Sequence, residues 1–332
     1  MKSSAVNPKF DALWLVGSLF VPICFYALYR WAATNYFSDR PEAGVIFFFV
    51  IFTTIFDAPH IFATLARTHF DRSEFKRRRN LHLLSLPMAL AVTLSAPVLG
   101  FEDAFLTFFG LYGSWHIIRQ NIGFLKMFHR HEPPSELGGR WEIYWMYMLF
   151  AFYLTHEVHS SRDIFGNWPH PIPYNLLLLC EWLTSSALVV CAFIIFLRAY
   201  QQRRATGTLA WAKLGFLFGS GALFIWLALV GAHPLILTAV GTIAHNIQYQ
   251  AWIWNYHSHH RGISKAWIAL AISLFTGAII GLGLADRYVI YGVMLPIATI
   301  YNGFVLWHYF IDGYIWRLRE APELRSLINQ NL

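Results

Sequence analysis

Long apolar runs recur along the whole 332-residue chain and restrict what it can fold into. A helix needs about 20 consecutive apolar residues to cross the hydrocarbon core of a membrane. Only 13% of the residues are charged, whereas a soluble domain carries about 25%. The sequence therefore predicts an all-α fold, a polytopic transmembrane helix bundle that forms a single integral membrane domain over residues 1–332. About ten spanning helices are expected, at 11–33, 43–66, 81–99, 103–126, 141–157, 174–198, 209–231, 234–256, 265–284 and 288–316.

The basic residues give this bundle an orientation. If the N-terminus lies in the cytoplasm, the cytoplasmic segments hold 20 of the 25 lysine and arginine residues, the outer segments hold four, and Arg119 lies within a span. Cytoplasmic loops of membrane proteins are enriched in these residues. We therefore expect the N-terminus and the C-terminus on the cytoplasmic side of a bacterial inner (plasma) membrane. The formal charge of +7 arises from these loops, so it does not indicate binding to nucleic acid.

One basic run, "RTHFDRSEFKRRRN" at 67–80, has two interpretations. It can be a topological anchor against anionic lipid, or a docking patch for an anionic substrate head group or a partner. We favour the anchor, which is the ordinary use of a cytoplasmic basic run beside a spanning helix.

Four histidines lie inside the predicted spans at a similar depth: His60, His116, His245 and His308. Each is on an even-numbered helix, and every even-numbered helix runs from the outside to the cytoplasm. Each precedes the basic residue or histidine at its cytoplasmic end by seven to twelve residues. At a rise of about 1.5 Å per residue, all four lie roughly 10–18 Å below the cytoplasmic surface. The common depth predicts one shared site in the cytoplasmic half of the bilayer.

Polar residues accompany each of these histidines on its own helix face, three or four positions away. Polar groups in hydrocarbon are costly and normally turn inward to pair, so these faces are expected to point at a common interior. Pro59 precedes His60 and removes a helical hydrogen bond, which predicts a local bend at the site. The accompanying residues are Asp57, Thr64 and Arg67; Arg119 and Gln120; Gln248 and Tyr249; and Asp312, with Tyr301 two turns before His308.

This combination of side chains predicts a metal site. Imidazole suits iron, zinc, copper and nickel, and carboxylates add oxygen ligands. We expect non-haem iron, as one or two ions. Either aspartate can instead be an outer partner that accepts a hydrogen bond from a ligating imidazole. Arg119 and Tyr249 are the predicted catalytic residues, and Arg119 is expected to neutralise an aspartate or to hold an anionic substrate or oxygen-derived intermediate. The predicted ligands are His60, His116, His245, His308, Asp57 and Asp312.

The other histidines are predicted to lie near the membrane surfaces. His245 and His257 are twelve residues apart, about 18 Å along a helix, so one metal cannot bind both. His156 and His159 are expected to form a solvated pair on the outer side. A cytoplasmic rim of histidines is expected to be mostly wet, with a second metal site there as the less favoured alternative. The rim comprises His69, His82, His129, His131, His257, His259 and His260.

Four strings of the sequence resemble a known family. "DAPHIFATLARTHFD", "WHIIRQNIGFL", "HNIQYQAWIW" and "WHYFIDGYIWR" are similar to strings of the UnbU-like integral membrane proteins associated with enediyne and polyene biosynthesis clusters. The resemblance touches four helices spread across nearly the whole chain. The positions that it implies are Asp57, His60, Arg67, His116, Arg119, Gln120, His245, Asn246, Gln248, Tyr249, His308, Asp312 and Arg317.

The general layout is also similar to the histidine-rich membrane oxygenases. These are the fatty-acid desaturase and hydroxylase group and the Brp/Blh β-carotene dioxygenases. The desaturase group uses HxxxH and HxxHH boxes, whereas this chain has "HSHH" at 257–260 and no HxxxH. The ligand pattern of the desaturases is therefore not repeated here.

A metal centre at this depth suits the oxidation of a hydrophobic substrate. We expect desaturation, hydroxylation or oxidative cleavage of a lipid, polyene or isoprenoid, with membrane lipid around the protein and an electron-donor protein on the cytoplasmic side. Two alternatives remain open. Paired histidines from two helices can clamp a haem b, as in a membrane electron-transfer protein. Intramembrane histidine, aspartate and arginine also form the proton relays of proton-coupled transporters.

Overall fold

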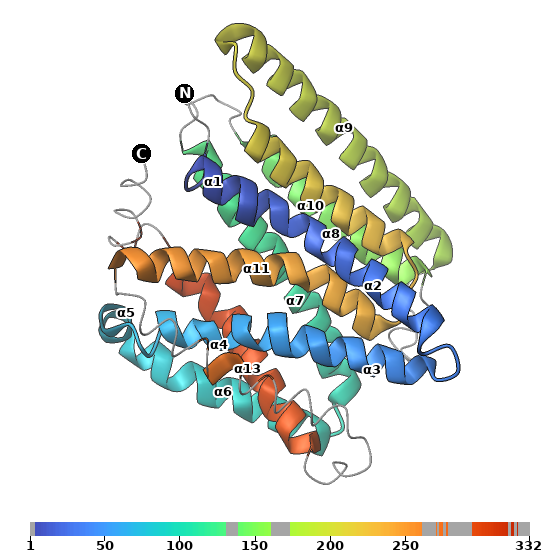
Figure 1. The fold of residues 1–332 in the computed structure, drawn as a ribbon, viewed down its shortest axis with the longest axis vertical. Helices are drawn as coiled ribbons and strands as arrows, with labels where there is room; N and C mark the ends of the chain where they lie inside the picture. The colour runs from blue at the N-terminus through green and yellow to red at the C-terminus, as the bar shows by residue number, and fades with distance from the viewer. Residues whose placement is uncertain are drawn as a thin grey trace. The chain divides into compact units, whose positions relative to one another are not determined.

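Helices make up all the regular structure of the described chain (Figure 1). The computed structural model describes residues 4–130, 139–160, 173–260, 270, 272–274, 277, 294–317, 320, 321 and 324. Five helical stretches in these ranges are long and apolar enough to cross a membrane. The all-α class is thus confirmed, together with helices suited to an integral membrane protein. The five stretches are Pro8–Asn35, Pro41–Arg67, Arg79–Val98, Asn175–Thr206 and Trp211–Leu229.

The observed helices overlap nine of the ten predicted spans within the described ranges. The predicted span at 265–284 lies mostly outside the described residues, as does the start of the one at 288–316. The described chain divides into two compact units. The first unit is Met1–Phe20 with Gly113–Pro234, and the second unit is Val21–Tyr112 with Leu235–Leu332.

The first unit is built around α8 (Arg140–Ser160), which packs against both α9 (Tyr174–Thr206) and α10 (Trp211–Leu229). A side chain added at Gly221 would lie 2.7 Å from Trp145, so the absence of one lets α10 approach α8 closely. The chain enters this unit through three short helical pieces: α1 (Pro8–Phe10), the π-helical η1 (Asp11–Val16) and the 3₁₀-helical η2 (Gly17–Phe20). The last two of them contact α10.

The second unit contains α2 (Val21–Asn35), α3 (Pro41–Phe52), the π-helical η3 (Thr53–Asp57), α4 (Ala58–Arg67), α5 (Arg72–Arg77), α6 (Arg79–Val98), most of α11 (Pro234–His260), α13 (Met294–Ile315) and the start of α7 (Glu102–His129). The boundary between the units falls within α7, between Tyr112 and Gly113.

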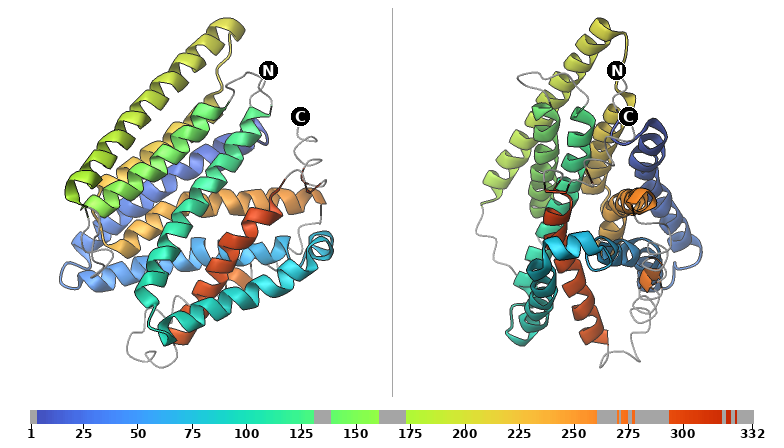
Figure 2. Two further views of the ribbon diagram at one scale, coloured as in Figure 1. Left: turned by 180° about the vertical axis from the view of Figure 1, so that it is seen from behind. Right: turned by 90° about the vertical axis from the view of Figure 1, so that its left-hand side faces the viewer.

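The packing of α13 against α6 anchors the second unit (Figure 2). A side chain at Gly303 would lie 2.6 Å from Leu90, so α13 comes close to α6 only because this position lacks one. One turn further on, the fully buried Trp307 donates a hydrogen bond from Nε1 to Ser85 Oγ at 3.0 Å. This contact fixes the rotation of α13 and thereby the face that carries His308, the next residue.

The predicted bend at Pro59 takes the form of a π-helical turn. Proline lacks the backbone N–H and its ring clashes with the carbonyl four residues earlier, here that of Ile55. The chain relieves the clash by widening the turn Thr53–Asp57, after which Pro59 lies in the first turn of α4. Such π-turns are frequent at functional sites. The widened turn packs closely on Gly277, whose carbonyl accepts a hydrogen bond from Thr54 Oγ1 at 3.2 Å.

Half of the six basic residues in the run 67–80 pair with acidic residues of the same run. Arg67 is fully buried and forms ion pairs with Asp71 at 2.8 Å and Glu74 at 3.3 Å. Arg77 and Arg78 also pair with Glu74. Asp71 caps α5 by accepting hydrogen bonds from the backbone of residues 73 and 74. Part of this run is therefore a structural ion-pair cluster, and the exposed cations Arg72, Lys76 and Arg79 remain for lipid or a partner.

Candidate metal centre

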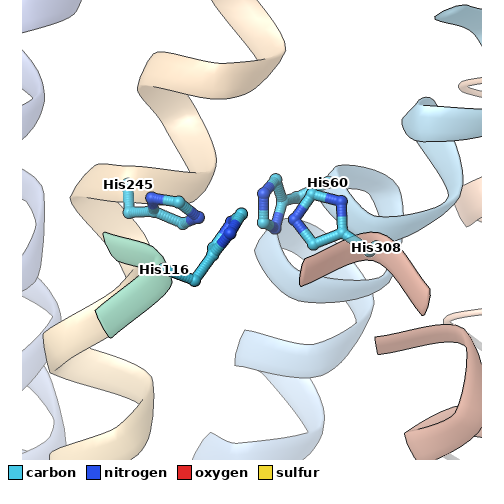
Figure 3. A group of neighbouring side chains, drawn as sticks. All are labelled: His60, His116, His245 and His308. Atoms are coloured by element: carbon cyan, nitrogen blue, oxygen red, sulfur yellow. The ribbon is translucent and has the colours of Figure 1, made fainter. Parts of the chain in front are cut away.

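The four deep histidines form one group, as their common depth predicts. His60, His116, His245 and His308 are all buried, and one ligand atom from each lies within 4.8 Å of the ligand atoms of the others. Figure 3 shows the four rings turned toward one another from α4, α7, α11 and α13. No other group of this kind occurs among the described residues. The group could therefore hold a metal ion.

Three of the four histidines, His60, His245 and His308, belong to the second unit, and the ring of His60 contacts the other two. Its ring centre is 4.7 Å from that of His245 and 4.4 Å from that of His308, with both contacts edge-on. Its position follows from the π-turn, because His60 is the third residue of α4. His116 lies on α7, about one helical turn beyond Tyr112, where the second unit ends.

The size of the group fits one ion. Imidazole nitrogens bind zinc at about 2.0–2.1 Å, so two of them on one ion are roughly 3.4 Å apart in a tetrahedron and at most about 4.2 Å apart. The observed limit of 4.8 Å exceeds this only slightly. Small rotations of the rings would close the difference, and an all-imidazole set suits iron, zinc, copper or nickel.

A chain of hydroxyl groups holds the outer side of His308. Thr64 Oγ1 lies 2.6 Å from His308 Nδ1 and 2.9 Å from Tyr249 Oη. Tyr249 donates its hydroxyl proton to Asp312 Oδ1 at 2.9 Å. Each hydroxyl donates once if His308 Nδ1 donates to Thr64 and Thr64 donates to Tyr249. This order leaves His308 Nε2 as the nitrogen that faces a metal.

The two predicted aspartate ligands are held by tyrosines and are not among the four grouped residues. Asp57 accepts hydrogen bonds from Tyr301 at 2.6 Å and from Asn246 at 3.4 Å. Asp312 accepts the bond from Tyr249, and its Oδ1 lies 3.7 Å from His308 Nδ1. Asp312 is thus linked to His308 indirectly, through Tyr249 and Thr64, whereas the contacts of Asp57 run to Tyr301 and Asn246.

The two predicted catalytic residues lie in different settings. Tyr249 is buried beside the histidines, with its ring centre 4.7 Å from that of His60 and 5.2 Å from that of His308. Arg119 is exposed on α7, donates to Tyr147 Oη at 3.4 Å and lies over the ring of Trp115. The contacts of Arg119 thus run to α8 and to its own helix.

Comparisons of the chain with protein-family models, with curated proteins and with solved structures find no match. The resemblance to the UnbU-like proteins stays a prediction.

The expectation of a mostly wet histidine rim was wrong for two of its members. His82 is fully buried, and its Nε2 lies 3.4 Å from Glu74. His257 is also buried, beside Tyr256. His259 is exposed as expected, whereas His131 and the side chain of His260 lie outside the described residues. The sequence predicted a solvated surface at this end of the helices, but Glu74 of α5 lies against His82.

Two further histidines near the surface lie beside glutamates. His129 Nε2 lies 3.7 Å from Glu142, which also accepts a hydrogen bond from the buried Lys213. On the side predicted to be outer, His156 is half-buried and bonds to Glu181 at 2.7 Å, so it is not simply solvated. The side chain of His159 lies outside the described residues.

Replacing Thr64 by valine is expected to weaken metal binding about 10–100-fold, because residues that orient a ligating histidine have effects of this size. Valine keeps the shape of threonine but removes the hydroxyl that holds His308 Nδ1. Thr64→Ser restores the hydroxyl and is expected to recover most of the affinity. Competition with a chromophoric chelator measures the dissociation constant of the metal.

The matched control for Thr64 is Thr68→Val, one turn along the chain. Thr68 is equally buried, but its hydroxyl donates to the carbonyl of Thr64 and contacts His69. The assigned role of Thr64 is wrong if Thr64→Val binds metal as tightly as the unaltered protein, or no more weakly than Thr68→Val.

Proposed function

We propose that the chain is a membrane-embedded, metal-dependent oxidoreductase that uses non-haem iron to oxidise a lipophilic substrate such as a lipid, polyene or isoprenoid. The observation that carries the proposal is the buried group of four histidines, together with five apolar helices of membrane-spanning length among the described residues. A redox metal in such surroundings suits a substrate dissolved in the bilayer, and dioxygen is more soluble in hydrocarbon than in water.

The membrane arrangement is part of the proposal. We infer about ten spanning helices, both termini in the cytoplasm of a bacterium, and the metal in the cytoplasmic half of the inner membrane. The distribution of 20 cytoplasmic against four outer basic residues supports this orientation. An electron-donor protein would then approach from the cytoplasm.

Direct binding of an ion by the histidines is favoured over haem b. Two imidazoles on opposite faces of a haem iron have nitrogens about 4 Å apart, which puts their ring centres about 6 Å apart. The ring centre of His60 is only 4.4 Å from that of His308 and 4.7 Å from that of His245. These edge-on contacts leave no room for a porphyrin between the rings.

A proton-coupled transporter is less well supported. A transporter needs ionisable groups that change partners between two states. The carboxylates of Asp57 and Asp312 are instead fixed by tyrosine hydroxyls within the second unit.

The test is elemental analysis and an optical spectrum of the protein purified from membranes in mild detergent. We expect about one iron per chain, no Soret band, and oxygen consumption when a reductant and an extract of polyene or isoprenoid lipids are supplied. A Soret band would mean that the alternative function, a haem b electron-transfer protein, is correct. Failure to hold any metal after anaerobic loading with ferrous iron would reject the proposal.

A further inference from the structure

The described part of the second unit contains two tyrosine–aspartate pairs, which differ in one respect. In each pair the phenol donates to a carboxylate, Tyr249 to Asp312 at 2.9 Å and Tyr301 to Asp57 at 2.6 Å. The ring of Tyr249 touches two of the grouped imidazoles. The ring of Tyr301 instead packs against Phe62 and the apolar cluster around it. Only Tyr249 therefore has a carboxylate on one side and the imidazoles of the candidate metal centre on the other.

The surroundings of Tyr249 are those that the one-electron oxidation of a phenol requires. A phenol that loses an electron becomes a very strong acid, so oxidation at moderate potential needs an acceptor for its proton. Asp312 Oδ1 is that acceptor, already in a hydrogen bond. The edge contacts with His60 and His308 give the electron a path of a few ångströms to a bound metal. Only 2% of Tyr249 is exposed, which would shield a radical from solvent.

We propose that Tyr249 is a redox-active residue that supplies one electron to the histidine-bound metal and its phenolic proton to Asp312. The inference rests on the proposed function, since it needs a redox metal in the site. It assigns to Tyr249 a chemical step, and it explains why one of two otherwise similar tyrosine–aspartate pairs adjoins the imidazoles.

Hydrogen peroxide allows the step to be balanced and observed. With ferrous iron in the site, peroxide is reduced to two water molecules by two electrons, one from the iron, which becomes ferric, and one from Tyr249. The phenolic proton passes to the carboxylate of Asp312, and the two protons that complete the water molecules come from solvent. The products are ferric iron and a neutral tyrosyl radical.

The experiment mixes iron-loaded full-length protein with hydrogen peroxide, freezes it within milliseconds and records electron paramagnetic resonance. We expect a tyrosyl radical in the unaltered protein and in the control Tyr301→Phe, and its loss in Tyr249→Phe. Replacement of Tyr249 by 3,5-difluorotyrosine keeps the hydroxyl and the shape, and it is expected to add fluorine splittings to the signal. This variant identifies the radical even if Tyr249→Phe fails to fold or to hold iron.

The outcomes separate this inference from the proposed function. If the protein binds iron and peroxide oxidises it, but the radical lacks fluorine splittings or resides on the neighbouring Trp316, Tyr249 is not the donor and the metal site stands. Trp316 is the relevant competitor because its ring centre lies 5.9 Å from that of Tyr249. If no redox metal binds, both the inference and the proposed function are rejected.

Discussion

Replacing His60, His245 or His308 by alanine is expected to lower the metal content of the purified protein at least about tenfold. Losing even an outer partner of a ligating histidine commonly costs 10–100-fold in affinity, so losing the ligand itself should cost no less. Each change removes a buried nitrogen from a group whose ligand atoms lie within 4.8 Å of one another. His116→Ala is expected to behave in the same way. Elemental analysis after dialysis against a weak chelator measures the effect.

Two histidines outside the group serve as controls for this experiment. His259 lies on α11, the helix that carries His245, but its side chain is exposed. His156 on α8 bonds to Glu181. Both alanine variants are expected to keep the full metal content. Equal loss in the controls and in the grouped histidines, or no loss in either, would contradict the assignment of the centre.

The helices could be predicted where an apolar run has a clear chemical boundary. The run 81–99 corresponds to α6, Arg79–Val98, because basic residues precede it and a glycine with positive φ follows it. The π-turn at Thr53–Asp57 could not be predicted in detail. Pro59 requires some relief of its clash with the preceding turn. Whether the helix kinks or widens depends on neighbours such as Gly277, which the local sequence does not specify.

The grouping of the four histidines could be predicted because the distance along a helix gives depth in a bilayer, whereas the two aspartates predicted as ligands lie outside the group. Counting residues from the charged ends places the four histidines in one layer, and burial of polar groups turns them inward. The support around them depends on contacts between helices. Thr64 is one turn from His60, yet its hydroxyl reaches His308, 244 positions away. The sequence shows the face of Thr64 but not which neighbouring helix meets it.

Charge density alone gave the wrong interpretation of Arg67, for a related reason. The run 67–80 contains six basic residues and two acidic ones, which suggests a solvated anchor. The ion pairs show the opposite for Arg67, which is fully buried. It lies between the aromatic rings of Tyr256 on α11 and of Trp316, the residue after α13. Its guanidinium carbon is 4.7 Å from the centre of the Tyr256 ring and 5.6 Å from that of Trp316. Helix packing therefore decides which cations face water.

Replacing Arg67 by alanine is expected to lower the free energy of unfolding by about 3–5 kcal/mol, because removing one member of a buried ion pair leaves the other charge uncompensated. Arg67 is fully buried and binds Asp71 and Glu74, and it donates to the carbonyl of Ile315 at 3.4 Å. Asp71 in turn accepts a hydrogen bond from Tyr256 at 2.8 Å. The change therefore removes contacts that hold α4, α5, α11 and α13 together. Thermal unfolding in detergent measures the loss.

The control for this variant is Arg72→Ala, in the same basic run. Arg72 is exposed at the first position of α5, so its removal should alter stability by less than about 0.5 kcal/mol. If Arg67→Ala unfolds at the same temperature as Arg72→Ala, the buried cluster does not hold these helices together.

Acid provides a second way to break the same cluster. Burial alone would raise the pKa of Glu74, but its hydrogen bond with His82 and the charges of Arg67, Arg77 and Arg78 lower it to about 2. A carboxylate with a depressed pKa stabilises the fold above its ordinary pKa, and that contribution is lost as the pH falls toward the folded value. We expect the melting temperature to fall between about pH 4.5 and pH 2, and to fall less steeply in Glu74→Gln, which starts from a lower value. Parallel pH profiles for the two proteins would show that Glu74 is not the group that acid protonates.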